Sequence, residues 1–213
     1  MKKLLLIGGG GHCKSIIDSL NQSTEYDIIG ILDTPNKLGT LISGIKVIGV
    51  DSEMQSWFDK GIEFAFIALG STGDTQLRQK LYEKAYLIGF KFPIINDPTA
   101  LISANARIGE GTFIGKGTII NTAVQIGKNA IINSGAIVEH DSTIGDYCHL
   151  APGATLSGNV SIGNHTHVGT NATVIQGIEI GEQSIIGAGS VVIRKIRSGS
   201  VAYGNPCKEA ERE

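Results

Sequence analysis

The second half of the chain repeats one pattern of side chains every six residues. Beginning at Ile102, every sixth residue is a branched aliphatic, sixteen times in succession and without interruption. A small or β-branched residue stands two positions before each of them, as at Thr112 and Ala136. The sixteen aliphatic positions are Ile102, Ile108, Ile114, Ile120, Ile126, Ile132, Val138, Ile144, Leu150, Leu156, Ile162, Val168, Val174, Ile180, Ile186 and Val192. So regular a repeat restricts this half to a fold that itself repeats every six residues.

Each six-residue unit is typical of one short strand followed by a corner. Two inward positions that lie two residues apart describe a strand with one buried face. A glycine often follows the aliphatic residue, as at Gly109, Gly127 and Gly145, and we expect it to supply the positive φ of a tight corner. Three strands and three corners close a coil of about 18 residues, which predicts a parallel β-helix of stacked triangular coils. The small inward residues, Cys148 among them, are then core.

Composition changes between the two halves of the chain. Of the twelve aromatic residues, nine precede residue 99. The turn sequence Asn96-Asp97-Pro98 lies close to this change. We therefore expect an N-terminal domain of residues 1–98, a β-helix of residues 99–197 and a C-terminal tail of residues 198–213.

Charge and cysteine content argue against several classes of function. The chain has 18 basic and 20 acidic residues, so neither a nucleic acid nor an acidic membrane surface is an expected partner. No apolar run approaches the ~20 residues of a bilayer span, and the apolar run near the N-terminus stops at Gly8, too early for a secretory signal. Three cysteines are too few for a disulfide framework. These features predict a cytoplasmic protein.

The first half alternates strand and helix patterns. Residues 4–7, 27–32 and 64–69 are typical of strands, and a helix is expected to about Leu20. Residues 74–89 carry Leu77, Leu81, Ala85 and Ile88 at helical spacing. This alternation predicts a small Rossmann-like parallel sheet covered by helices. Ligands bind such sheets at the carboxyl ends of the strands, and the candidate contacts at those ends are Gly10, Gly11, His12, Asp33 and Gly70.

The glycine-rich turn at residues 8–11 leaves two further interpretations open. Gly8-x-Gly10 after a strand, with Asp33 about twenty residues on, is also found in dinucleotide-binding sites, but Cys13 stands where the third glycine of that motif belongs. A glycine turn without any ligand is the second interpretation. Cys13 falls in the first helical turn, where the helix N-terminus could activate its thiol.

Four of the five histidines lie in the repeat: His140, His149, His165 and His167. Histidine is the natural general base near neutral pH, and Asp141 directly follows His140, where it could orient the imidazole. His140 falls at a corner and His149 half a coil later on a flat side, so they lie on opposite sides of one prism and would act together only between chains. His167 lies one coil beyond His149, so the two rings are expected to be neighbours. His165 is expected at a solvated corner.

The complete chain resembles the hexapeptide-repeat sugar acetyltransferases of bacterial glycan pathways. The features in common are the Gly-His turn at residues 8–12, the small parallel sheet and the unbroken repeat. This family includes the bacillosamine-pathway type that acts on UDP-linked 4-amino-sugars, the GDP-perosamine type and the sialic acid O-acetyltransferase type. The resemblance implies a left-handed β-helix, a homotrimer, and acetyl-CoA bound between neighbouring prisms.

The resemblance also implies roles for individual residues. It makes His140 the catalytic base and Asp141 its acidic partner, although many members have Glu at that position. The implied contacts of acetyl-CoA are His149, Gly158 as the oxyanion amide, Thr170, Ala188 and Lys208. Lys208 ends the sequence Tyr203-Gly204-Asn205-Pro206-Cys207-Lys208, which is similar to an element that closes many members near the coenzyme. The implied contacts of the nucleotide-sugar are Gly10, Gly11, His12, Asp33, Thr34 and Gly70.

The leading hypothesis is therefore an acetyl-CoA-dependent N-acetyltransferase for an amino-sugar carried on a nucleotide. O-acetylation of a sugar of the sialic acid type would use the same base and is the alternative. A zinc hydratase on the same prism is less favoured, because only His165-x-His167 offers two closely spaced histidines; no metal is expected. A scaffold without catalysis would have no reason for His140-Asp141. His149 as a plain surface residue is also an alternative.

Overall fold

The computed structural model describes residues 1–210, which divide into two compact units. The N-terminal unit consists of Met1–Ser71 and Thr75–Ile95, and the prism unit consists of Thr72–Asp74 and the chain from Asn96 onward. Among the described residues, no helix has the length and apolar character needed to cross a membrane.

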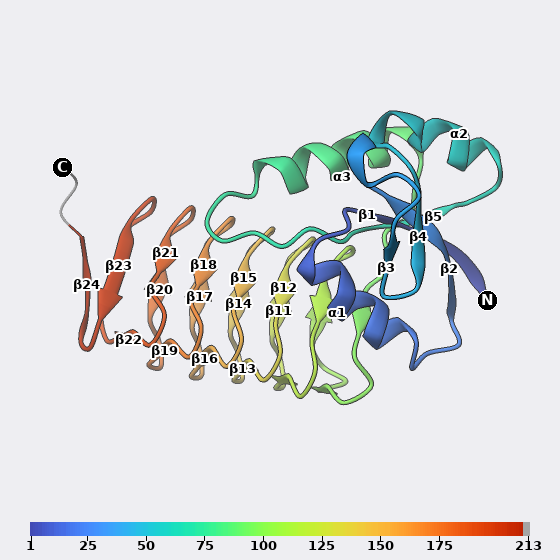
Figure 1. The fold of residues 1–213 in the computed structure, drawn as a ribbon. Helices are drawn as coiled ribbons and strands as arrows, with labels where there is room; N and C mark the ends of the chain where they lie inside the picture. Colours follow the sequence, from blue (N-terminus) through green and yellow to red (C-terminus); the bar gives the residue numbers. More distant parts are fainter. Residues whose placement is uncertain (211–213) are drawn as a thin grey trace. The chain divides into compact units, whose positions relative to one another are not determined.

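The N-terminal unit contains a five-stranded sheet with the strand order β3-β4-β2-β1-β5. Its strands are β1 (Lys2–Ile7), β2 (Tyr26–Leu32), β3 (Leu41–Ile42), β4 (Ile45–Gly49) and β5 (Phe64–Ile67). Its helices are α1 (Gly11–Leu20), α2 (Met54–Asp59) and α3 (Gln76–Ile88), with short 3-10 turns η1 (Pro35–Lys37) and η2 (Asp51–Glu53). β1, β2, β4 and β5 are parallel, whereas β3 pairs with β4 in antiparallel orientation. Within this unit, α1 lies on one side of the sheet and α2 and α3 on the other (Figure 1).

The Rossmann-like prediction is confirmed in outline and differs in detail. The β3–β4 hairpin and α2 were not expected from the sequence, and β5 ends at Ile67 rather than Leu69. In α3, Leu81 and Ala85 are buried as expected, but Leu77 is 59% exposed. The buried face of α3 contains Arg78 and Tyr82 instead. Polar and aromatic residues thus occupy helical positions that an aliphatic pattern alone does not identify.

The prism unit consists of three parallel sheets whose strands are contributed in turn by successive coils. The β7 sheet contains β7 (Leu101–Ile102), β10 (Ile119–Ile120), β13 (Ile137–Val138), β16 (Thr155–Leu156), β19 (Thr173–Val174) and β22 (Val191–Val192). The β8 sheet contains β8 (Arg107–Ile108), β11 (Gln125–Ile126), β14 (Thr143–Ile144), β17 (Ser161–Ile162) and β20 (Glu179–Ile180). The β6 sheet contains β6 (Ile95–Asn96), β9 (Phe113–Ile114), β12 (Ile131–Ile132), β15 (His149–Leu150), β18 (His167–Val168), β21 (Ile185–Ile186), β23 (Val201–Gly204) and β24 (Cys207–Glu209).

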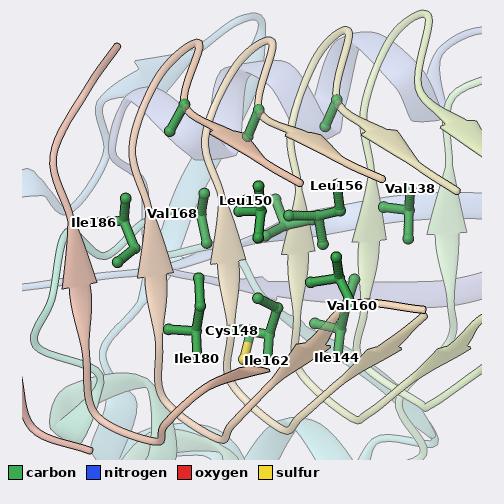
Figure 2. Close-up of a cluster of buried hydrophobic side chains, with 14 of the residues drawn as sticks. Val138, Ile144, Cys148, Leu150, Leu156, Val160, Ile162, Val168, Ile180 and Ile186 are labelled. Carbon is green, nitrogen blue, oxygen red and sulfur yellow. The ribbon is translucent and has the colours of Figure 1, made fainter. Parts of the chain in front are cut away.

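The strand register confirms a coil of three hexads. Ile131 pairs with His149, and His149 pairs with His167, so each coil advances the chain by 18 residues. The second residue of each strand from β7 to β22 points into the prism, where Leu150, Leu156 and Val168 pack with their counterparts from other coils (Figure 2). Cys148 is fully buried among them, as predicted. This is a left-handed hexapeptide β-helix.

The prediction that the glycine directly after each inward aliphatic residue has positive φ is wrong. The residue with positive φ lies three positions after the inward aliphatic, not directly after it, and it recurs every sixth residue from Gly111 to Gly189. Asn129, Asp141 and Asn159 are among the non-glycine residues that adopt it. Glycines such as Gly127 instead allow close stacking, since a Cβ there would lie 2.8 Å from the carbonyl carbon of Gly145 in the next coil. The tightness of the coil stack, and not backbone φ, requires these glycines.

Candidate active site

The catalytic pair predicted from the sequence lies at a corner between the β7 and β8 sheets. His140 follows β13 and precedes β14, and its Nδ1 lies 2.8 Å from Oδ2 of Asp141. Asp141 adopts a left-handed conformation, with φ of 61°, and its backbone N–H donates to the carbonyl of Thr122 one coil below. The corner geometry thus turns the Asp141 carboxylate back onto the imidazole. Both side chains are more than half exposed, at 56% and 61%.

Gly158 lies directly against the His140 ring. A Cβ built on Gly158 would be 2.6 Å from both Cε1 and Nε2 of His140. The next residue ties the two coils together, because the Asn159 N–H donates to the carbonyl of His140 at 2.8 Å. Within residues 1–210, no protein acceptor takes a hydrogen bond from the Gly158 amide. His140, Asp141 and an available amide therefore meet at one corner.

His149 occupies a different side of the prism. It is the outward residue of β15 in the β6 sheet, yet it is only 9% exposed, which argues against a plain surface role. Its Nε2 lies 3.3 Å from Nδ2 of Asn133. His167, one coil along, contacts it edge to face with ring centroids 4.9 Å apart. Burial lowers the pKa of His167, so its ring is uncharged near neutral pH.

The remaining predicted coenzyme contacts are distributed over several parts of the prism. Thr170 and Ala188 are both exposed and occupy the same corner in adjacent coils, after β18 and β21. Their backbones are linked through Gly189, whose N–H donates to the Thr170 carbonyl at 2.8 Å. Gly158 lies at another corner. Within one chain, the structure therefore groups Gly158 with His140 but not with Thr170 and Ala188.

Lys208 is exposed in β24, where it lines a groove of about 690 Å³ at the C-terminal end of the prism. Other cations of this groove are Arg194, Lys195 and Arg197. Lys195 pairs with Glu179, and Arg197 with Glu209. Among the described residues, Arg194 and Lys208 make no such ion pair. The groove therefore presents uncompensated positive charge to a ligand.

The predicted contacts of the N-terminal unit gather where the strand order of its sheet reverses. The chain runs outward from β1 to β2 and β4, and then returns to the other side of β1 as β5. Ligands of such sheets bind in the crevice at this reversal. The glycine turn after β1 and Gly70 after β5 flank it, and His12 packs against Gly70, 3.4 Å from the position of a Cβ there. A Cβ built on Gly10 or on Gly11 would have no neighbouring atom within 4 Å, so the space beside these residues is open.

Asp33 holds the glycine turn in place. Its carboxylate accepts hydrogen bonds from the N–H of Gly9 at 2.7 Å, the N–H of Thr34 at 2.6 Å and Nζ of Lys37 at 2.9 Å. Burial raises the pKa of Asp33, but these hydrogen bonds outweigh it and hold the pKa below its usual value. Thr34 also donates to Asn36 through its hydroxyl. Asp33 therefore fixes the shape of the turn.

Two sequence predictions about other residues are wrong. The Cys13 thiol is not activated, because burial and the nearby Asp33 carboxylate raise its pKa to about 12. His165 is half-buried rather than solvated, and its ring stacks on Tyr147 with centroids 5.1 Å apart and planes within 2°. Residues 1–210 contain no cluster of three metal-binding side chains.

Sequence reasoning missed Asn133 and Arg194. Asn133 contacts His149 only because it lies at the adjacent corner one coil earlier, 16 residues away. Asn133 lies two residues after Ile131, which pairs with His149 in the neighbouring coil, so its nearness to His149 is visible only once the register of the coil is known. Arg194 belongs to the groove of Lys208 through a hairpin, β23–β24, that breaks the six-residue repeat.

Comparison with known families identifies both parts of the chain. Residues 3–85 match the PglD N-terminal domain. Residues 105–140, 123–158 and 159–194 match the bacterial transferase hexapeptide (six repeats). A comparison with curated proteins gave no match.

Three solved structures illustrate the likeness over the full chain. Perosamine N-acetyltransferase from Caulobacter crescentus, with one histidine replaced by asparagine and in complex with CoA and GDP-perosamine, is 37% identical, with a TM-score of 0.93 over 100% of this chain and 98% of that one. The acetyltransferase domain of PglB from Neisseria gonorrhoeae, in complex with acetyl coenzyme A, is 31% identical, with a TM-score of 0.88 over 98% and 99%. WeeI from Acinetobacter baumannii is 26% identical, with a TM-score of 0.85 over 99% and 100%. The chain belongs to the hexapeptide-repeat sugar acetyltransferases that carry a PglD-type N-terminal domain.

Proposed function

We propose that this protein transfers the acetyl group of acetyl-CoA to the amine of an amino-sugar carried on a nucleotide. The observation that carries the proposal is the His140 corner, where an imidazole oriented by Asp141 lies directly against Gly158. Two relatives support the reaction class: one named as a perosamine N-acetyltransferase, in complex with CoA, and one named as an acetyltransferase domain, in complex with acetyl coenzyme A. The first of these names also favours an amine over the hydroxyl of the O-acetyltransferase alternative.

His140 is proposed as the general base. Asp141 accepts from Nδ1–H of the neutral ring, so the lone pair of Nε2 is left to receive a proton. Because Nε2 faces Gly158, the base and the proposed oxyanion donor bracket one position for the reacting carbon. The exposure of His140 gives an incoming amine access to Nε2.

The proposed reaction is a direct attack without a covalent enzyme intermediate. The amine nitrogen forms a bond to the thioester carbon and loses its proton to Nε2 of His140, and the C–S bond then breaks. The proton taken up by His140 balances the charge of the leaving thiolate, so that free CoA and an amide are the products. During the attack, negative charge develops on the thioester oxygen, and the Gly158 N–H is the proposed donor to it.

We assign acetyl-CoA binding to the prism unit. His149 is proposed at the acyl end, Thr170 and Ala188 along the pantetheine chain, and Lys208 at a phosphate. The groove around Lys208 supports the last assignment, because Arg194 adds a second uncompensated cation to it.

We assign nucleotide-sugar binding to the N-terminal unit. Gly10 and Gly11 open the N-terminus of α1, whose free N–H groups favour a phosphate, and the absence of side chains there permits close approach. His12, Thr34 and Gly70 flank the same crevice, and Asp33 holds the turn. The sheet reversal at this point supports the assignment.

A homotrimer is proposed as the working form. The outward residues of the β7 sheet are apolar or β-branched: Leu101, Ile119, Ile137, Thr155, Thr173 and Val191. Those of the β8 sheet are polar: Arg107, Gln125, Thr143, Ser161 and Glu179. Ile119 remains 36% exposed in the single chain. Burying this apolar face against a second copy would place His140, at its edge, beside the neighbouring chain. A cytoplasmic location stays a prediction, supported by three free cysteines.

The test is acetyl-CoA turnover, followed as free thiol, against a panel of nucleotide-linked amino-sugars and free sialic acid. Turnover with one nucleotide-linked amine, reduced about 10²–10⁴-fold in His140→Ala, is the expected result. Turnover with sialic acid alone would instead establish the O-acetyltransferase. Failure to bind coenzyme A would remove the acyltransferase assignment.

A further inference from the structure

We propose that Asn133 fixes His149 as a neutral imidazole with its proton on Nδ1, so that His149 serves the reaction only as a hydrogen-bond donor and never as a second base. Asn133 is thus a positioning residue that acts through His149. The inference rests on the proposed function only for the role that the His149 donor has in the reaction. Its principal test measures the resting protein and does not depend on acetyl transfer.

The orientation of the Asn133 amide follows from its neighbour. The backbone N–H of Ser134 donates to Oδ1 of Asn133 at 2.8 Å. A backbone N–H can only donate, so the atom facing Ser134 must be the carbonyl oxygen and not the amide nitrogen. The side chain cannot be reversed without losing this bond. Nδ2 is therefore the atom that faces His149.

The same logic then determines the protonation of His149. Nδ2 of Asn133 is a donor and lies 3.3 Å from Nε2 of His149, so Nε2 must accept. A neutral ring that accepts at Nε2 carries its proton on Nδ1. An imidazolium would place a second N–H against the Asn133 donor, and its charge would be mostly desolvated because His149 is only 9% exposed.

His167 supports the neutral state from the opposite side. Its ring meets that of His149 edge to face at 4.9 Å, and its Nδ1 is buried without a hydrogen-bond partner in residues 1–210. Two charged rings at this separation would repel each other at a half-buried site. The contact thus favours two uncharged rings and limits rotation of His149.

The two histidines of the proposed reaction therefore have different roles: His140 can accept a proton, whereas His149 can only donate a hydrogen bond. His140 keeps its proton on Nδ1 through Asp141 and leaves Nε2 to take up another. His149 has its only basic nitrogen occupied by Asn133. A carbonyl oxygen, such as that of an acyl or pantetheine group, is the chemistry that a fixed N–H donor recognises.

The tautomer can be measured directly by long-range ¹H–¹⁵N correlation spectra of the full chain labelled at histidine, with His149→Gln used to assign its signals. We expect Nδ1 of His149 to be protonated and Nε2 to be unprotonated from pH 6 to 8. Asn133→Asp replaces the donor with an acceptor and should move the proton to Nε2 or make the ring an imidazolium. Asn164→Asp is the matched control, because Asn164 also accepts from a backbone amide at a corner, that of Asp146, and lies away from His149 on the corner that precedes His165.

Kinetics provides the second measurement. Asn133→Asp should lower kcat about 10-fold or more while the nucleotide-sugar KM changes little, and Asn164→Asp should change neither. A wild-type His149 with its proton on Nε2, or a tautomer unchanged in a folded Asn133→Asp, would overturn the proposal. If Asn133→Asp does not fold, Asn133→Ala serves, and it should yield a mixture of the two tautomers. The spectra remain decisive even if the acceptor sugar proves to be different.

Discussion

At the scale of single residues, the conformation of Asp141 matters as much as its charge. Its left-handed backbone, with φ of 61°, is what returns its carboxylate to Nδ1 of His140. Adjacency in the sequence suggested this contact, but only the corner geometry makes it. Asparagine tolerates the same backbone conformation, which allows the charge to be removed without strain.

We expect Asp141→Asn to keep the stability of the wild type and to lower kcat about 10-fold or more, because a neutral amide stabilises the imidazolium less. Thermal unfolding and initial rates with saturating acetyl-CoA measure the two quantities. An unchanged kcat would show that His140 needs no acidic partner.

Gly158 offers a second test at this scale. In Gly158→Ala the new Cβ would lie 2.6 Å from Nε2 of His140, so the ring must move away from the proposed reaction point. We expect kcat to fall about 10²-fold with little change in coenzyme A affinity, measured by calorimetry. Ser157→Ala, a neighbour at the same corner, is the control and should behave as the wild type. Equal rates for both variants would contradict the assigned position of the base.

The lowered pKa of His167 predicts a pH dependence of stability. Burial disfavours the charged ring, so the folded chain takes up this proton at lower pH than the unfolded chain does, whose ordinary value is 6.5. The unfolded state therefore binds more protons below about pH 6.5, and stability must decrease as the pH falls through this window. We expect the unfolding temperature of His167→Leu to fall less than that of the wild type between pH 7 and pH 5. If the unfolding temperatures of the two proteins fell equally with pH, His167 would not contribute to the acid sensitivity of the fold.

At the scale of elements, the repeat is predictable almost residue by residue, because every inward position obeys one steric rule. The role of each glycine in the repeat is not predictable from the sequence, since close contact between coils and positive φ both select glycine. Contacts across coils, such as Asn133 with His149, also stay hidden until the 18-residue register is known. The β3–β4 hairpin does have a turn signal, because Ser43-Gly44 joins the two strands with positive φ at both residues. β3, at two residues, is too short to show a strand pattern beside that turn.

The two kinds of glycine can be separated by substitution. In Gly127→Ala the Cβ would lie 2.7 Å from the backbone nitrogen of Asp146, so we expect a loss of about 1–3 kcal/mol of unfolding free energy. Gly177 has φ of 70° and open space around a Cβ. Gly177→Asn should therefore unfold at nearly the wild-type temperature, because asparagine fills the equivalent position at Asn159. Equal destabilisation of the two variants would contradict this division.

At the scale of the whole molecule, the apolar β7 sheet predicts self-association. Ile119→Arg places a charge in the proposed interface, whereas Gln125→Arg places the same charge on the polar β8 sheet. We expect sedimentation equilibrium to give a trimer for the wild type and Gln125→Arg, and smaller species for Ile119→Arg. If Ile119→Arg were still a trimer, the β7 sheet would be excluded as the interface between the chains.

The assembly also determines whether one chain holds a complete site. His140 lies at the corner between the β7 and β8 sheets, and His149 lies on the β6 sheet opposite to it. If the site combines His140 of one chain with His149 of the next, His140→Ala and His149→Ala chains must complement each other when co-expressed. In randomly mixed trimers, about a quarter of the sites would unite two intact histidines, so we expect about a quarter of the wild-type activity from two nearly inactive parents. A site within one chain would give no recovery, because each chain lacks one of its histidines. The recovered fraction therefore distinguishes the two arrangements without requiring the structure of the assembly.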